Sequence, residues 1–240
     1  MAKSKQIKII CSNCGAEVEF TVYDSINAKL DANLKDKLID DTLYKVDCSC
    51  GAKLKEIYPL LYHDPDKKFV VYGAHPDSIY KIVQTFDIMK EKNPDAYNGY
   101  TLRAVSSPTA LREKVIILNA GLDDRVIELY KFLDVTSINE LHAEANATKA
   151  YFYIEDGKNM LEFNSTYYIN KEITSTNYEF IKEAYAEEIL ASENSYIIDD
   201  VWAENVLLGD DDFEESTTLD DNLIEVIKEI YDEDDQDEIN

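Results

Sequence analysis

The sequence has few of the residues that build flexible linkers, and it contains no long apolar run. Seven glycines and five prolines among 240 residues argue against a long flexible linker. No stretch approaches the roughly 18 apolar residues of a membrane-spanning helix. Lysines interrupt the short apolar patch within the first ten residues, which excludes a typical signal peptide. We therefore expect a cytoplasmic protein with no membrane partner.

Positive charge is also scarce. The chain has 24 Lys and Arg against 49 Asp and Glu, for a net charge of −25. Binding to nucleic-acid phosphates needs clustered Lys and Arg, so no nucleic-acid partner is expected. That expectation would change only if five N-terminal lysines gathered on one face: Lys3, Lys5, Lys8, Lys53 and Lys55.

Four cysteines are present, in two pairs that are each followed by glycine. Cys11 and Cys14 lie in CSNCG, and Cys48 and Cys50 lie in DCSCG. Four thiolates complete the tetrahedral shell of a zinc ion, and such a closed shell is structural because it leaves no position for water. The following glycines allow a left-handed turn over the metal. The pattern predicts a zinc site formed by all four cysteines.

Other uses of the cysteines remain open on the sequence alone. A redox dithiol at Cys11 and Cys14 is disfavoured, because no helix follows directly to lower the pKa of a thiol. An iron centre, or cysteines that bind no metal, would also fit the pairing.

Hydrophobic periodicity predicts an α+β protein. Alternating residues 17–22 indicate a strand, and Asp31 can cap a short helix that carries Leu34 and Leu38. Further strands are expected at 57–62, 69–72 and 100–105, and helices at 79–86, 108–119 and 123–133. A hairpin at 151–163 and helices at 177–190 and 199–209 follow. The aromatic residues between 151 and 185 are interpreted as core and sheet packing.

These elements suggest two folded parts, which are followed by an acidic tail (210–240). Residues 7–134 would form a first domain, made of a zinc-ribbon-like module (7–75) with strands and a short helix, and a helical segment (76–134). Residues 135–209 would form a second α+β unit. Because structural zinc contributes strongly to folding, a chelator is expected to melt residues 7–75 and to leave the later hairpin folded.

The C-terminal residues 210–240 are exceptionally acidic. They hold 15 acidic residues and one lysine, which is −14 of the net charge. An amphipathic helix is expected within this acidic tail, at 219–231. Its apolar stripe would either complete the chain's own core or dock in a groove of a partner, and the acids would favour a basic partner.

Catalytic signatures are sparse. Glycine-rich phosphate loops, HExxH and GxSxG patterns are missing. The alternative to a binding protein is an enzyme that uses His63 and nearby acids, since an oriented histidine can act as a general base. His63 and Asp64 are expected in a turn between two strands, where turn chemistry explains them equally well.

Several stretches together resemble the prokaryotic CpXC-domain family. The resemblance covers about the first 130 residues and is carried, in order, by CSNCG, SINAKLDANLKDKLIDDTLY, CSCG, YPLLYHDPDKKFVVY and LRAVSSPTALREKVIILNAGLDDRVIEL. It implies that the paired cysteines bind zinc.

The chain departs from the family pattern at both cysteine pairs. Ser12 stands where the family has proline, and the second pair lacks one residue. The fourth ligand is therefore either Cys48 or Asp47. With that choice open, we expect a zinc-binding protein with a structural four-cysteine site that acts as a non-catalytic module for interaction with another protein.

Overall fold

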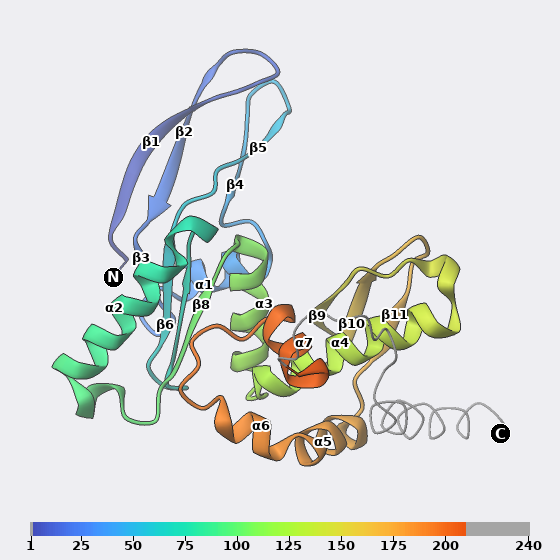
Figure 1. Ribbon diagram of the computed structural model, residues 1–240. Helices are drawn as coiled ribbons and strands as arrows, with labels where there is room; N and C mark the ends of the chain where they lie inside the picture. Colours follow the sequence, from blue (N-terminus) through green and yellow to red (C-terminus); the bar gives the residue numbers. More distant parts are fainter. Residues whose placement is uncertain (1, 210–240) are drawn as a thin grey trace. The chain divides into compact units, whose positions relative to one another are not determined.

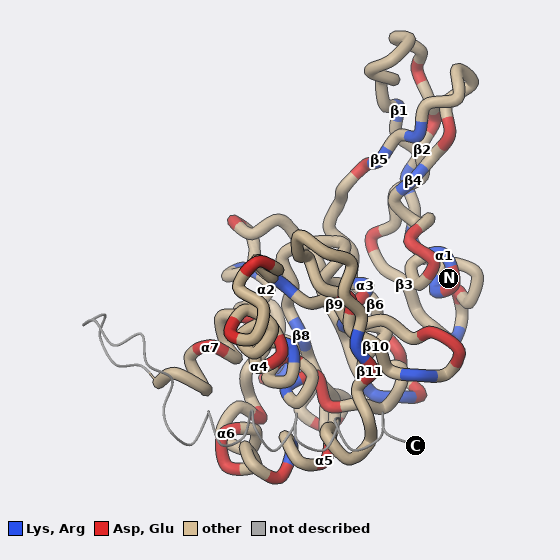
Figure 2. Tube along the Cα trace, turned by 90° about the vertical axis from the view of Figure 1, so that its right-hand side faces the viewer, with Lys and Arg blue, Asp and Glu red and all other residues tan. Residues whose placement is uncertain are grey.

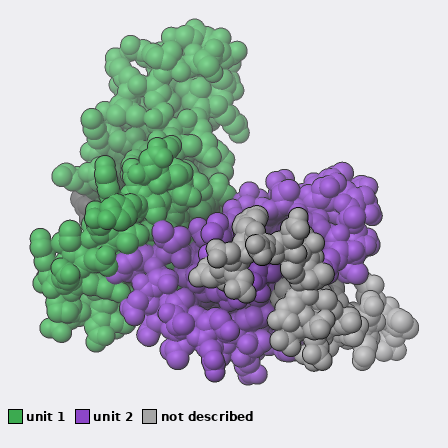
Figure 3. All heavy atoms as spheres, viewed as in Figure 1, with its two compact units in different colours: residues 1–121 green, residues 122–240 purple. Residues whose placement is uncertain are grey.

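A computed structural model describes residues 2–209 of the chain (Figure 1). The fold is mixed α+β, as predicted, and it divides into two compact units, residues 1–121 and 122–240 (Figure 3). The amphipathic helix predicted at 219–231 lies outside the described residues. Within them, no helix is both long and apolar enough to cross a membrane.

Unit 1 combines a four-stranded sheet, two separate hairpins and three helices among its described residues. The sheet has the order β3-β6-β7-β8, in which β6 and β7 are antiparallel and the two outer pairs are parallel. Strands β1 and β2 form one antiparallel hairpin, and β4 and β5 form the other. The elements are β1 (Ser4–Ile10), β2 (Glu17–Tyr23), β3 (Ser25–Asn27), α1 (Ala32–Ile39), β4 (Lys45–Asp47), β5 (Lys53–Lys55), β6 (Leu60–Asp64), β7 (Phe69–Gly73), α2 (Ile79–Lys92), β8 (Thr101–Val105) and α3 (Pro108–Asn119).

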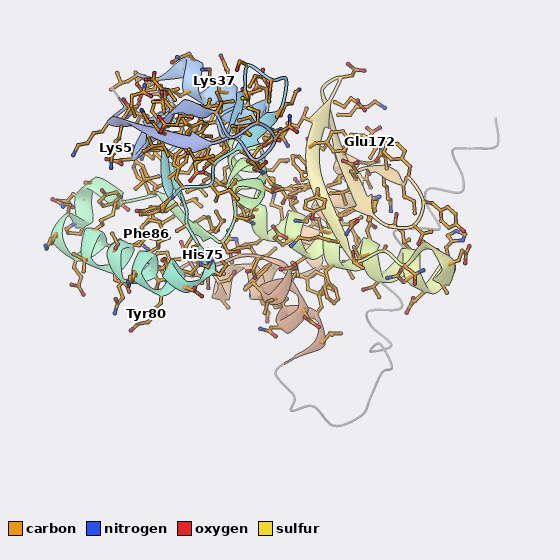
Figure 4. The ribbon with its side chains drawn as sticks, turned by 90° about the horizontal axis from the view of Figure 1, so that it is seen from above. Lys5, Lys37, His75, Tyr80, Phe86 and Glu172 are labelled. Carbon is orange, nitrogen blue, oxygen red and sulfur yellow. The ribbon has the colours of Figure 1, made fainter. Side chains whose placement is uncertain are left out.

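The core of unit 1 is built by the sheet together with α1 and α3. Its buried apolar side chains come from residues 26–115: Ile26, Leu34, Leu38, Leu43, Tyr44, Leu60, Tyr62, Phe69, Val71, Val105, Leu111 and Val115. Helix α2 adds buried Ile82 and Phe86, whereas Tyr80 points away from the strands (Figure 4). The hairpins β1–β2 and β4–β5 lie side by side and project away from this core (Figure 1).

Local sequence signals account for most element boundaries. Helix α3 begins at Pro108, and the Ser107 side chain accepts a hydrogen bond from the N–H of Ala110, as its sequence predicted. Leu34 and Leu38 are the buried residues of α1, also as expected. The Asp31 side chain, however, does not cap that helix. It accepts hydrogen bonds from the backbone N–H groups of Ala2 and Asn27.

The placement of His63 and Asp64 in a turn was wrong. Both belong to β6, where His63 pairs with Val70 and Asp64 pairs with Phe69. The turn starts at residue 65, where the buried Asp64 carboxylate accepts hydrogen bonds from the N–H groups of Asp66 and Lys67, at 3.2 and 3.0 Å. Asp64 therefore anchors the turn from the end of the strand.

Unit 2 packs a three-stranded antiparallel sheet with α4 (Asp124–Leu141). The sheet order is β11-β10-β9, with β9 at Lys149–Glu155, β10 at Lys158–Asn164 and β11 at Asn170–Glu172. The described part of unit 2 also contains the α-helices α5 (Ser175–Ala184), α6 (Ala186–Ala191) and α7 (Asp200–Leu208). The single helix predicted at 177–190 is two helices, because the backbone at Tyr185 leaves helical geometry (φ −114°, ψ 30°).

Candidate metal centre

The first cysteine pair lies in the loop of hairpin β1–β2. The last cross-strand pair is Ile10 with Glu17, which leaves residues 11–16 as the loop. The N–H of Cys11 donates to the carbonyl of Ala16 (2.9 Å), and the N–H of Gly15 donates to the carbonyl of Cys11 (2.8 Å). Gly15 has φ +74°, a left-handed conformation that favours glycine. The loop thus turns back over its own cysteines.

The second pair lies in an equivalent but shorter loop, between Asp47 and Lys53 of hairpin β4–β5. The N–H of Cys48 donates to the carbonyl of Ala52 (2.8 Å), and the N–H of Gly51 donates to the carbonyl of Cys48 (2.9 Å). Gly51 has φ +87°. The hydrogen bond from the glycine N–H to the cysteine carbonyl joins residues three apart in this loop and four apart in the first loop. The second loop is therefore one residue shorter within the turn itself. Cys48 occupies the place that Cys11 has in the first loop.

The two loops meet at the end of the hairpins (Figure 1) and bring the four sulfurs together. The Sγ atoms of Cys11 and Cys50 are 3.7 Å apart, as are those of Cys14 and Cys48, and all four lie within 4.8 Å of one another. Zinc–sulfur bonds of about 2.3 Å in a tetrahedron place sulfurs about 3.8 Å apart. The four cysteines are therefore positioned to bind one metal ion.

Hydrogen-bond donors favour the thiolate form at part of this cluster. The Asn13 side chain donates to the Cys50 sulfur (3.5 Å), and with the N–H of Ala52 it lowers the pKa of Cys50 to about 6. The N–H of Ala16 favours the thiolate of Cys14, but hydrogen bonds with the other three sulfurs outweigh it and raise the pKa of Cys14 to about 12. Such donors offset the negative charge that four thiolates place around a divalent ion. Asn13 was not recognised from the sequence, where it looked like an ordinary loop residue.

Asp47, the alternative fourth ligand, is not part of the cluster. It is an exposed residue of β4 that pairs with Lys53, whereas Cys48 is buried among the sulfurs. Among the described residues, the metal-binding group that contains these sulfurs consists of cysteines alone. This geometry favours Cys48 as the fourth ligand.

We expect Cys48→Ser to weaken zinc binding by more than about 100-fold. Loss of a residue that only hydrogen-bonds to a metal ligand costs roughly 10–100-fold, and loss of a ligand itself should cost more. Asp47→Asn should leave zinc affinity within about twofold of the unchanged chain, because the carboxylate lies outside the sulfur group. Competition with a chromogenic chelator measures both constants. A larger loss in Asp47→Asn than in Cys48→Ser would make Asp47 the ligand.

His63, the candidate general base, is partly buried and faces an aromatic residue. Its Nε2 lies 3.3 Å from the hydroxyl of Tyr100, and the two rings are 5.7 Å apart. Burial lowers the pKa of His63, and the charge of Asp64 opposes that change. Asp64 already holds the turn and lies 3.8 Å from the Lys35 ammonium group. His63 does not line the cavities found around Tyr58, Phe132 and Tyr167.

Lysines and acidic residues are interspersed along the cysteine hairpins (Figure 2). Side chains alternate along a strand, so Lys5 and Lys8 point to opposite faces of β1. Lys8 is moreover paired with Glu17 at 2.6 Å. Lys5 and Lys8 therefore do not share one face of β1.

A sequence model described as "CpXC protein" matches residues 9–131. The chain belongs to the CpXC family. The part that matches the CpXC model includes both cysteine loops, the whole four-stranded sheet and the start of α4. Searches among curated proteins and solved structures gave no match.

Proposed function

We propose that this CpXC chain holds one structural zinc ion through Cys11, Cys14, Cys48 and Cys50. The observation that supports this most strongly is the separation of the sulfurs, 3.7 Å for two pairs and at most 4.8 Å for any pair. An all-thiolate tetrahedral set selects zinc or an iron centre over magnesium or calcium, which prefer oxygen. The position of both cysteine pairs in turns at hairpin ends supports a zinc-ribbon-like module.

The zinc ion would act as a cross-link between two hairpins far apart in the sequence. Four sulfur ligands leave no open coordination position, so the ion activates no water and the site is non-catalytic. A two-stranded hairpin by itself is only marginally stable in water. The ion would therefore fix the shape of a projecting element, in a cytoplasm whose reducing conditions keep the thiols available.

The projecting hairpins are suited to contact another protein. Ile10, directly before Cys11, is 63% exposed at the end of β1. Ile10 directly precedes Cys11 and pairs with Glu17, so it lies in the last cross-strand pair before the cysteine loop. An exposed apolar side chain on a rigid element is a typical anchor for a protein–protein contact. We propose that the zinc-bound hairpins present this surface to a partner protein.

Metal analysis of protein purified without added metal tests the zinc assignment. We expect one zinc ion per chain by mass spectrometry of the metal, and less than about one tenth of that in Cys11→Ser/Cys50→Ser. The exposed loop variant Ser12→Ala is the control and should keep its zinc. Stoichiometric iron with thiolate-to-iron absorption, or full-length folded protein that contains no metal, would contradict the proposal.

The interaction role has its own test. A partner that is recovered with the intact chain should be lost with Ile10→Glu and after chelation of the metal. Ile57→Glu is a matched control, because Ile57 is also 63% exposed but lies outside the hairpins. Equal loss with both variants would indicate a non-specific effect of the added charge and would contradict a contact through the hairpin end.

A further inference from the structure

The three-stranded sheet of unit 2 has two chemically different faces. Ala150, Phe152, Leu161 and Phe163 are buried on one face. Alternation places Tyr151, Tyr153, Met160 and Glu162 on the other face, where they are half-buried or exposed. The tyrosines of β9 therefore lie on the open face of the sheet, whereas Phe152 and Phe163 pack in the core.

Glu162 lies at the centre of this open face. It is on β10, the middle strand, with Tyr151 opposite it on β9 and Asn170 opposite it on β11. The Asn170 side chain donates to the Tyr168 hydroxyl (2.9 Å), which ties that tyrosine to the same side of the sheet. The carboxylate is thus flanked by a tyrosine on each side.

Glu162, Tyr151 and Tyr168 line a hollow of about 470 Å³. We call it the tyrosine hollow, and its lining consists of Tyr151, Glu162, Phe163, Asn164, Ser165, Thr166, Tyr167 and Tyr168. Tyr167 and Tyr168 are 55% and 81% exposed, which is unusual for such large side chains. Exposed aromatic rings around a concave surface are typical of binding sites.

The charge of Glu162 is not balanced within the described part of the chain. The two lysines of this face are paired elsewhere, Lys149 with Asp200 (2.8 Å) and Lys158 with Glu172 (2.6 Å). Glu172 is labelled in Figure 4. Among residues 2–209, Glu162 makes no ion pair. Burial raises the pKa of Tyr153, and the charges of Glu155, Tyr168 and Glu162 add to that effect.

We propose that the tyrosine hollow binds a cationic side chain from an arginine- or lysine-rich segment of another protein. The faces of aromatic rings attract cations, and a guanidinium group can stack on tyrosine while it donates hydrogen bonds to a carboxylate. Glu162 supplies the carboxylate between Tyr151 and Tyr168. The net charge of −25 would in addition attract a basic segment and speed its association.

This inference extends the proposed interaction role to a second surface, but it does not depend on the metal. The hollow lies entirely in unit 2, and the cysteines lie in unit 1. Zinc-depleted and zinc-bound full-length chain should therefore bind a cationic peptide equally well, so failure of the zinc assignment and failure of this inference give different results.

The test uses full-length protein and fluorescently labelled nine-residue peptides in which glycine alternates with arginine, lysine or citrulline. Citrulline keeps the shape of arginine without its charge. Fluorescence anisotropy should show binding of the arginine and lysine peptides and loss of binding with citrulline. Glu162→Gln should raise Kd for the arginine peptide about tenfold. Tyr168→Ala, at an exposed ring, should raise it roughly two- to fivefold.

Glu155→Gln is the matched control. It removes the same charge from the same face of the sheet, and Glu155 does not line the hollow. A change of less than twofold in this variant, together with the tenfold change in Glu162→Gln, supports the inference. Equal changes in both variants would mean general attraction to an acidic protein and would overturn it. Stronger binding of free arginine than of the arginine peptide would also overturn the inference. So would self-association of the chain that disappears in Glu162→Gln, because the hollow would then bind a second copy of this chain.

Discussion

Removal of the proposed zinc ion is expected to unfold the two cysteine hairpins while the four-stranded sheet of unit 1 stays folded. The hairpins at residues 4–23 and 45–55 contribute none of the strand residues that form the main core cluster. A structural zinc ion contributes roughly 10–16 kcal/mol of apparent folding free energy in zinc-finger peptides. Without the ion, each hairpin would keep its two-stranded pairing, which is marginal, and β2 would keep the contacts of Phe20 with Tyr58 and of Tyr23 with the core cluster.

Hydrogen exchange of the full chain, with and without a strong chelator, measures this directly. Opening free energies in β1, β2, β4 and β5 should fall toward zero, and those in β6 and β7 should be kept. The hairpin β9–β10 of unit 2 is an internal control and should not change. Unchanged protection of the cysteine hairpins after complete metal removal would contradict a structural role for the ion. Loss of protection across residues 7–75 would show that the sheet depends on it too.

Leu111→Ala is expected to destabilise unit 1 by about 2–5 kcal/mol. Leu111 is fully buried in the core cluster, where α3 packs on β7. Its side chain lies against Gly73, and a Cβ atom on that glycine would come within 3.3 Å of it. Truncation to alanine would therefore leave a cavity between α3 and β7. Urea unfolding followed by circular dichroism measures the loss.

The same substitution at an exposed site provides the control. Leu30→Ala removes the same atoms from a side chain that is 66% exposed, so the free energy of unfolding should change by no more than about 0.5 kcal/mol. Comparable destabilisation in both variants would contradict the position of the core between α3 and the sheet.

Local chemistry made much of the fold predictable. Ser107 with Pro108 marked the start of α3, and Asp199 marked the start of α7 by accepting a hydrogen bond from the N–H of Trp202. The cysteine spacing was enough to predict the sulfur cluster, because two cysteine pairs that are each followed by glycine are typical of turns that share one metal ion.

The missed features depend on contacts between residues far apart in the sequence. Strand β1 was not predicted, since its apolar alternation is limited to Ile7 and Ile9 and its pairing with β2 is set by the cysteine loop between them. The sequence also did not show that β6 and β7 join β3 and β8 in a core sheet separate from the cysteine hairpins. Residues 7–75 therefore looked like one module, whereas the structure divides them between the cysteine hairpins and the core sheet, and we now expect metal dependence of the hairpins only.

X-ray absorption at the zinc edge, on protein purified without added metal, tests the central claim most directly. The account predicts four sulfur neighbours at about 2.3 Å and no nitrogen or oxygen in the first shell. Two or three sulfurs completed by a lighter atom would contradict the assignment of all four cysteines, and the absence of a zinc edge would contradict the zinc site itself.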